Sequence, residues 1–342
     1  MATFDVCNGD ADGLCAAMQW RLHRHRSDQG GGPPVTLVTG LKRDIELLKH
    51  VPAQRGDEVN VFDISMLRNH AELQRLLAAG VRVRYFDHHQ APDKVSHPLL
   101  EAHVDRASDV CTSLLVDRHL GGAFRAWALV GAYGDNLTRV ADQLAAVSGF
   151  SADDCQQLRR LGEVINYNAY GDSDADVCIA PAWLFKLMLP HRDPRDLLAS
   201  EGIVDEIDEL RQADLRQAMG WTPAWQGPQG RVLVLPDAPW ARRVLGCLAN
   251  ELANAQPGQA HAVLKAQAAG EPAVAGGVHA SAGASYAVSV RAPLSAPMGS
   301  DKLCSAFGGG GRARAAGIDE LPVADLNRFI AAFAAMRWGE PG

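Results

Sequence analysis

Apolar runs of strand length alternate with amphipathic stretches over the first quarter of the chain. The runs are rich in valine and aromatic residues, and they lie at 3–7, 35–38, 59–62 and 81–86. The stretches between them place apolar side chains at helical spacing, as Leu14, Met18 and Leu22 do after the first run. Because strand and helix in alternation are typical of a parallel sheet with helices on both faces, the pattern predicts an α/β fold.

The middle of the chain is helical in its periodicity. The longest of these helices carries Ile203, Ile207 and Leu210 on one face. A segment rich in proline and glycine follows at 221–230, and its composition is that of a domain boundary. We therefore expect three parts, with a cleft between the sheet domains: a parallel-sheet domain at 1–150, a helical connector at 151–222 and a smaller mixed α/β domain at 230–342.

The last of these parts has short runs of valine and alanine that predict four strands. They lie at 232–235, 262–266, 273–278 and 287–291. Helical spacing is found at 241–253 and again at 326–336. This order of elements favours a mixed sheet rather than a second parallel one.

Composition narrows the class of protein. The 342 residues are 47% hydrophobic, which is enough for more than one core. A net charge of −7 argues against binding to long duplex nucleic acid, so any nucleic-acid ligand should be short. The seven cysteines form no CxxC pair and fit a reducing cytosol. With no charged leader and no run of eighteen apolar residues, we expect a cytoplasmic protein without a membrane segment.

Acidic and histidine side chains follow three of the four apolar runs: Asp10 and Asp12 the first, Asp63 the third, and Asp87, His88 and His89 the fourth. Crossover helices put the carboxyl ends of parallel strands on one edge of the sheet, where α/β proteins place their ligands. These side chains should therefore share that edge. For Asp12 taken alone, capping of the following helix is the alternative.

Several carboxylates in one place repel each other, and each raises the pKa of the next unless a cation lies among them. Aspartate oxygens together with an imidazole nitrogen suit Mn²⁺ or Mg²⁺ better than the metals that prefer thiolates. Two such ions need one bridging carboxylate. Asp63 is the candidate, because it follows a central strand and has no acidic neighbour in sequence.

Two further segments have the composition of anion sites. Lys42 and Arg43 come just after the second run, where a phosphate can bind, although a solvated helix start explains them equally well. The segment at 307–317, FGGGGRARAAG, lets backbone N–H groups approach an anion closely. Its Ala315-Ala316 is expected to open a helix whose positive end faces that anion, with a flexible linker as the alternative.

Four motifs together resemble the DHH phosphoesterase superfamily in order and spacing: NGDADG at 8–13, VFDIS at 61–65, YFDHHQ at 85–90 and GAYGDN at 131–136. That superfamily includes exonucleases of the RecJ kind, nanoRNases, cyclic-di-AMP phosphodiesterases and one class of inorganic pyrophosphatases. The resemblance implies two Mn²⁺ ions, one held by Asp10 and Asp63 and the other by Asp12, Asp63, His88 and Asp135. It further implies that Asp87 is a ligand or is hydrogen-bonded to one, and that His89 faces the scissile phosphate. Asn8 stands where the superfamily usually has a histidine or aspartate.

The glycine segment resembles the loop of the DHH-associated C-terminal domain that binds the nucleotide end of the substrate. Arg312 stands where that loop usually has histidine, and Arg291 matches the phosphate-binding arginine of that domain. The implied contacts to substrate are Arg291, Gly309, Gly310, Gly311 and Arg312, with Lys42 and Arg43 as candidates from the first domain.

The expected function is that of a two-metal phosphodiesterase of the exonuclease type with Asp63 and His89 as catalytic residues. Its cofactor would be Mn²⁺ or Mg²⁺, and its substrate nanoRNA, 3′-phosphoadenosine 5′-phosphate or a linear or cyclic dinucleotide. A homodimer is compatible with the sequence. Two alternatives stay open. A nucleotide-binding module with a weakened metal site is suggested by Asn8 and Arg312, and an inorganic pyrophosphatase would share the first domain but lack the glycine loop.

Overall fold

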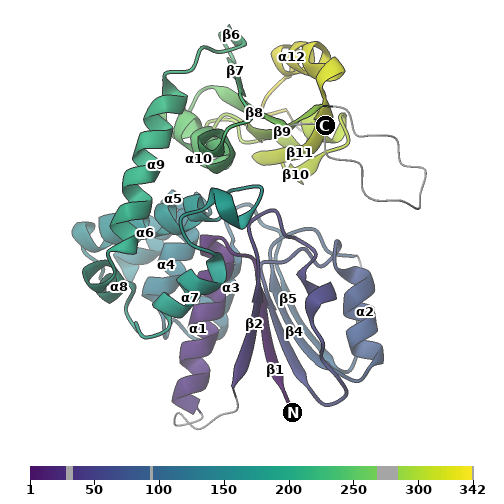
Figure 1. The fold of residues 1–342 in the computed structure, drawn as a ribbon, viewed down its shortest axis with the longest axis vertical. Coiled ribbons are helices and arrows are strands. Elements are labelled where there is room, and N and C mark those ends of the chain that lie inside the picture. Colours follow the sequence, from purple (N-terminus) through teal and green to yellow (C-terminus); the bar gives the residue numbers. More distant parts are fainter. Residues whose placement is uncertain (28–33, 93–94, 268–283, 341–342) are drawn as a thin grey trace. The chain divides into compact units, whose positions relative to one another are not determined.

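The computed structural model describes residues 1–27, 34–92, 95–267 and 284–340 (Figure 1). The chain divides into two compact units, Met1–Glu209 and Leu210–Gly342. The helices of the expected connector belong to the first unit as far as Glu209. The strand predicted at 273–278 lies outside the described residues.

The first unit is built on a five-stranded parallel sheet in the order β2-β1-β3-β4-β5. Its strands are β1 (Thr3–Cys7), β2 (Val35–Thr39), β3 (Glu58–Phe62), β4 (Arg82–Asp87) and β5 (Leu100–Val104). The register aligns Cys7, Phe62 and Phe86 in one row, so the three central strands end at the same level. The predicted parallel sheet is confirmed. The edge strand β5 was not predicted.

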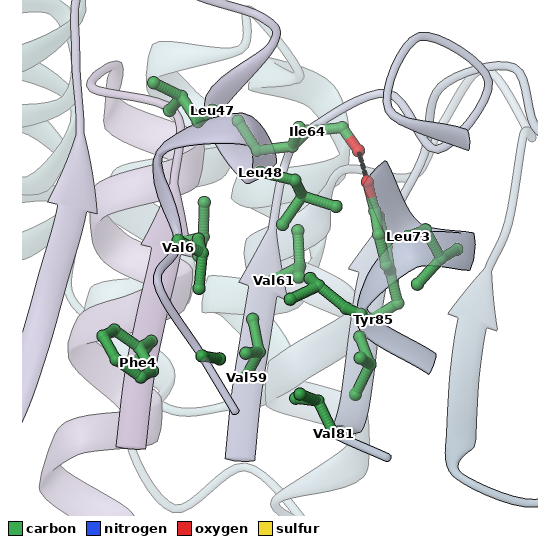
Figure 2. Close-up of a cluster of buried hydrophobic side chains, with 14 of the residues drawn as sticks. Phe4, Val6, Leu47, Leu48, Val59, Val61, Ile64, Leu73, Val81 and Tyr85 are labelled. Atoms are coloured by element: carbon green, nitrogen blue, oxygen red, sulfur yellow. Dashed lines mark hydrogen bonds between the residues drawn. The ribbon is translucent and has the colours of Figure 1, made fainter. Parts of the chain in front are cut away.

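One face of this sheet carries an apolar core (Figure 2). Val61 of β3 and Tyr85 of β4 point to this face and pack with Leu48 and Leu73. Leu48 belongs to the 3₁₀ helix η1 (Leu47–His50), and Leu73 belongs to α2 (His70–Ala78). Each fully buried aliphatic side chain of this kind stabilises the fold by roughly 1.5–3 kcal/mol relative to exposure. The Tyr85 hydroxyl donates a hydrogen bond of 2.7 Å to the carbonyl oxygen of Ile64.

The segment at 45–49 was predicted to be a helix, and only the short 3₁₀ turn η1 forms there. Pro52 follows closely. Because a proline disfavours helical backbone angles in the residue before it, the segment ends before an α-helix can be completed.

On the other face, α1 (Ala11–Ser27) and α3 (Thr112–His119) pack on the sheet, and α4 (Arg125–Gly134) and α6 (Ala152–Asn168) pack on the helices. Helices α4 and α6 approach unusually closely, because a Cβ atom on Gly162 would lie 2.3 Å from the Val130 carbonyl oxygen. This close packing fixes the end of α4, which is followed directly by Asp135. The remaining helices of the unit are α5 (Thr138–Val147), η2 (Asp174–Asp176), α7 (Pro181–Met188) and α8 (Pro194–Ser200), and α9 (Ile203–Met219) leads into the second unit.

The second unit has a six-stranded mixed sheet in the order β10-β11-β9-β8-β7-β6. Its strands are β6 (Trp225–Gly227), β7 (Gly230–Leu235), β8 (Ala260–Gln267), β9 (Ser285–Arg291), β10 (Gly310–Arg312) and β11 (Ala315–Pro322). Among the strands that the structure describes in this unit, only β7 and β8 pair in parallel, and α10 (Pro239–Ala255) connects them. The other helices are α11 (Ser300–Ser305), η3 (Val323–Asp325) and α12 (Leu326–Ala335), whose Phe329 and Phe333 are buried in the core of the unit.

The helix expected to open at Ala315 is not formed, and that prediction was wrong. Residues 310–312 and 315–317 pair instead as an antiparallel hairpin. Ile318 and Leu321 of β11 are buried in the core, which fixes this segment as a strand. The glycines serve the close pairing of the hairpin, because a Cβ atom on Gly309 would lie 2.2 Å from the Gly317 carbonyl oxygen.

Candidate metal centre

The acidic and histidine side chains predicted to share one edge do lie at the carboxyl ends of β1, β3 and β4. These are the three neighbouring central strands of the first sheet. Backbone hydrogen bonds join the segments just beyond the strand ends: Asn8 N–H donates to the Phe62 carbonyl at 3.3 Å, and Asp63 N–H donates to that of Phe86 at 3.1 Å. The parallel sheet therefore positions each functional residue directly.

Asp12, Asp63 and His88 form the centre of the site. The His88 Nε2 atom lies 3.2 Å from Asp63 Oδ1 and 3.8 Å from Asp12 Oδ2, and all three side chains are buried. The other ring nitrogen of His88, Nδ1, lies 2.9 Å from the Val110 carbonyl oxygen. Because a carbonyl can only accept, Nδ1 must carry the proton. In the neutral ring Nε2 then presents its lone pair to the carboxylates, as a metal-binding histidine does.

The Asp12 carboxylate is held by the start of α3. Its two oxygens accept hydrogen bonds from the backbone N–H groups of Thr112, at 2.8 Å, and Ser113, at 2.7 Å. The positive end of the helix stabilises an ionised carboxylate here. The Thr112 hydroxyl in turn donates to Asp63 Oδ1 at 3.3 Å. This contact could not be found from the sequence, because its two partners are far apart along the chain.

Asp63 occupies a strained and electrostatically unfavourable position. Its φ of 58° lies in the left-handed region, which a residue other than glycine seldom adopts. Burial raises the pKa of Asp63 well above its usual value, and the neighbouring charges of Asp10 and Asp12 raise it further. Strain and like charges at one buried residue are typical of a functional site, and a bound cation would offset the repulsion.

Asp10 is engaged on both of its oxygens. One accepts the Gly13 N–H at 3.0 Å, and the other forms a short ion pair with the Lys42 ammonium. Burial alone would raise the pKa of Asp10, but the Lys42 charge outweighs that effect and holds the pKa below its usual value. Asn8 is also occupied, because its side chain bonds the Lys42 carbonyl oxygen at 3.2 Å and the Asp10 N–H at 3.1 Å.

Lys42 therefore lies within the predicted metal cluster. Its ammonium group is also 3.3 Å from Asn166 Oδ1 and 5.4 Å from the centre of the Tyr170 ring. Arg43, its neighbour in sequence, points elsewhere and pairs with Asp172 at 2.8 Å. Asn166 is supplied by α6.

Asp87 and His89 form a pair beside the centre. Asp87 accepts the backbone N–H groups of Met66, His88 and His89 at 2.9–3.2 Å, together with the His89 Nδ1–H at 2.7 Å. These bonds engage both carboxylate oxygens, so Asp87 orients His89 rather than facing the His88 Nε2 atom. Burial lowers the pKa of His89, but the Asp87 charge dominates and raises it above the usual value. His89 is 42% exposed, so its ring can reach a substrate.

Asp135 completes the set at the end of α4. Its charge raises the pKa of both Asp10 and Lys42, which shows that it lies in their neighbourhood. The structure thus brings together residues from four separate segments. The donor set fits a hard divalent cation, because one oxygen each of Asp12 and Asp63 lies within 3.8 Å of the His88 Nε2 atom.

The predicted substrate residues of the second unit form a row across its sheet. The register aligns Arg312, Ala315 and Arg291 on β10, β11 and β9, and it continues with His261 on β8 and Arg231 on β7. Paired residues point to the same face of a sheet, so three arginines and the buried His261 share one face. Small Ala315 leaves space between the two arginines that flank it.

The order of these elements defines a class of fold: a parallel sheet with acids at three central strand ends, followed by a mixed sheet with a glycine hairpin. No family model and no curated protein sequence matches the chain. Among solved structures, it is similar to the exonuclease RecJ bound to manganese, with 19% identity and a TM-score of 0.58 over 99% of this chain and 91% of that one. It is also similar to the DHH domain of a member of a family of ribosomal proteins, with 15% identity and a TM-score of 0.63 over 97% and 85%.

A pGpG-specific phosphodiesterase from Vibrio cholerae is similar over 97% of both chains, with 15% identity and a TM-score of 0.54. The chain therefore has the fold of RecJ and the DHH-domain proteins, and the fold predicted from the four motifs is confirmed. In the part of the chain that the structure describes, no helix is long and apolar enough to cross a membrane.

Proposed function

We propose that this chain is a divalent-metal-dependent phosphodiesterase of the DHH type that hydrolyses short nucleotide substrates. The observation that carries the proposal is the convergence of the Asp12 and Asp63 carboxylates on the Nε2 atom of the buried His88 ring. Asp12 and Asp63 are like charges beside the buried His88 ring, and one divalent cation among them would offset their repulsion. Asp135 lies in the same neighbourhood and is the fourth proposed ligand.

Bound divalent ions supply Lewis-acid stabilisation of phosphoryl oxygens and lower the pKa of a water molecule. The chain itself prepares the rest of the site. Thr112 and Ser113 fix the Asp12 carboxylate, and the Val110 carbonyl fixes the His88 ring. Asp87 directs the His89 ring and raises its pKa, which favours the protonated form whose Nε2–H can donate to a phosphoryl oxygen of the substrate.

The number of ions is the finer part of the proposal. Two Mn²⁺ or Mg²⁺ ions are expected from the resemblance, with Asp10 and Asp63 holding one of them. As Asp10 lies, one of its oxygens pairs with the Lys42 ammonium, so an ion there competes with Lys42 for this carboxylate. Equilibrium titration of the metal-free chain with Mn²⁺ counts the ions, and a Lys42→Met variant shows whether Lys42 competes with one of them.

The basic row of the second unit supports a nucleotide substrate. Arg291 is preorganised by hydrogen bonds to Asn250 Oδ1, at 2.6 Å, and to Ser289 Oγ, at 3.0 Å. Such fixed guanidinium groups suit phosphate recognition, since their planar fork can bind two oxygens at once. Arg312 shares its face of the sheet. Together with the net charge of −7, this favours a short ligand with few phosphates over a long polymer.

One observation favours a second function. Asn8 carries no charge, and its side chain is already bound to Lys42 and Asp10, so it is a weaker metal ligand than a histidine or aspartate would be. This favours a module with a weakened metal site and retained nucleotide binding. The two functions differ in hydrolysis, since only the enzyme turns over its ligand.

The deciding experiment incubates the metal-free chain and Mn²⁺ with a diribonucleotide, 3′-phosphoadenosine 5′-phosphate, a cyclic dinucleotide and pyrophosphate. We expect hydrolysis of a nucleotide substrate, and at least about 100-fold slower hydrolysis by His88→Gln, since even partners of metal ligands cost 10–100-fold. His50→Gln, which changes an exposed histidine of η1, is the matched control and should keep full activity. Nucleotide binding without turnover would identify the weakened module. Turnover of pyrophosphate alone would identify a pyrophosphatase.

A further inference from the structure

A second group of metal-binding side chains lies away from the strand ends, on the edge strand of the first sheet. Glu101 and His103 are alternate residues of β5 and so point to the same face, and His119 is the last residue of α3 (Figure 1). One carboxylate oxygen and one nitrogen from each ring all lie within 4.8 Å of one another. None of these residues belongs to the DHH motifs.

Aromatic packing fixes the two histidine rings. His103 stacks on Phe86 of β4 with ring centres 4.5 Å apart and an angle of 9° between the planes. The His119 ring stands edge-on to both, with centres 4.8 Å from His103 and 5.2 Å from Phe86. Phe86 is fully buried, so it is a rigid platform for the two rings. The histidines are therefore held close to each other before any ligand binds.

The Glu101 carboxylate is oriented by Arg84. The Arg84 Nε atom donates to Glu101 Oε2 at 2.8 Å, which leaves Oε1 directed at His103 Nε2, 2.8 Å away. Arg84 is itself held by Asn60 at 3.2 Å and lies over the Trp20 ring at 4.7 Å. A supported carboxylate next to a ligand is a common feature of metal sites.

Two imidazoles and one carboxylate are the ligand set of many zinc sites that keep a fourth position open. Two nitrogen donors select a cation such as Zn²⁺ over Mg²⁺ or Mn²⁺, in contrast to the oxygen-rich strand-end site. Glu101 and His119 are exposed, so a cation and its water ligand have access. His119 also lies in the last turn of α3, where the helix carbonyl groups favour a positive charge.

We propose that Glu101, His103 and His119 form a binding site for one Zn²⁺-like divalent cation, separate from the strand-end centre. A hydrogen-bonded Glu101–His103 pair without a metal is the simpler explanation of two of these residues. It does not account for the third donor atom, which His119 of another element places within 4.8 Å of the other two. A cation here joins the edge strand β5 to the end of α3, the helix whose first residues hold Asp12.

The experiment uses the full-length chain with His88→Gln, which weakens the strand-end centre, and measures Zn²⁺ binding by calorimetry and by metal analysis after dialysis. One Zn²⁺ per chain should remain bound. Adding His119→Ala should weaken it at least about 100-fold. Glu101→Gln should do so as well, and the exposed control His50→Ala should change nothing.

The proposal is overturned if Zn²⁺ binding is the same with and without His119, or if the His88→Gln chain binds no Zn²⁺. It does not depend on the proposed phosphodiesterase activity. His119→Ala in the otherwise unchanged chain should keep its Mn²⁺-dependent hydrolysis, so a failure of one assay is distinguishable from a failure of the other. Circular dichroism of each variant confirms that the fold is retained.

Discussion

Replacing Asp63 by asparagine should stabilise the metal-free protein and remove its response to metal. Asparagine tolerates the left-handed φ of 58° better than most residues, and its side-chain oxygen can still accept the Thr112 hydroxyl. The change therefore removes a charge with little change of shape. Asp12 Oδ2 and Asp63 Oδ1 are both close to His88 Nε2, so their repulsion across at most about 7 Å, at an effective dielectric constant of about 20, is about 2 kcal/mol.

The pH dependence follows from the raised pKa of Asp63. The folded chain retains a proton on this carboxyl. The stability that this proton contributes is fully present at a pH below the unfolded pKa of Asp63, and it is lost as the pH rises through the raised folded pKa. The advantage of Asp63→Asn should therefore be small near pH 4 and should grow as the pH is raised to 8. For a unit of about 200 residues, about 2 kcal/mol corresponds to a rise in Tm of roughly 4–8 °C.

The assay is thermal unfolding at both pH values, with and without Mn²⁺. In the wild-type chain, Mn²⁺ at 100 times its Kd should add about 2.7 kcal/mol of stability, and Asp63→Asn should gain almost none of it. Asp109→Asn, which changes an exposed acid before α3, is the matched control and should behave as wild type. A metal-free Asp63→Asn variant that is no more stable than wild type at pH 8 would refute the electrostatic reasoning, and one that still responds to Mn²⁺ would refute the ligand assignment.

Three further predictions concern the surroundings of the site and the second unit. Asp87→Asn should let the pKa of His89 fall, so the loss of kcat/KM on the alkaline side should begin at a lower pH than in wild type. Tyr85→Phe leaves the buried Ile64 carbonyl without its hydrogen-bond donor, so the free energy of unfolding measured in urea should fall by about 1–2 kcal/mol. The Mn²⁺ affinity of this variant should be unchanged. Burial and a nearby arginine lower the pKa of His261 to about 4. The free energy of unfolding of the second unit should therefore fall by up to about 3 kcal/mol as the pH falls from about 6.5 to 4, and His261→Leu should reduce that dependence on pH.

The strand-end site could be predicted because its geometry follows from one rule. Parallel strands end on one edge, so Asp10, Asp63 and His88 had to meet once the alternation of strands and helices was recognised. The division of labour within the Asp87-His88-His89 motif could not be predicted. It depends on which donors surround each side chain, and the donors to Asp87 come largely from backbone N–H groups that sequence does not reveal.

Contacts between distant segments set the limit elsewhere. Lys42 was a candidate for phosphate binding, and its ion pair with Asp10 depends on how the β2 end packs against α6. The glycine segment has a composition suited to either a loop or a hairpin, and the burial of Ile318 decides for the hairpin. His103 and His119 carry no motif at all, and only the fold brings them together.

Anomalous diffraction from crystals of the full-length chain grown with Mn²⁺ examines the proposed metal centre most directly. We expect a manganese peak within bonding distance of Asp12, Asp63 and the Nε2 atom of His88. Manganese found only at other positions, with these three side chains bare, would contradict the assignment.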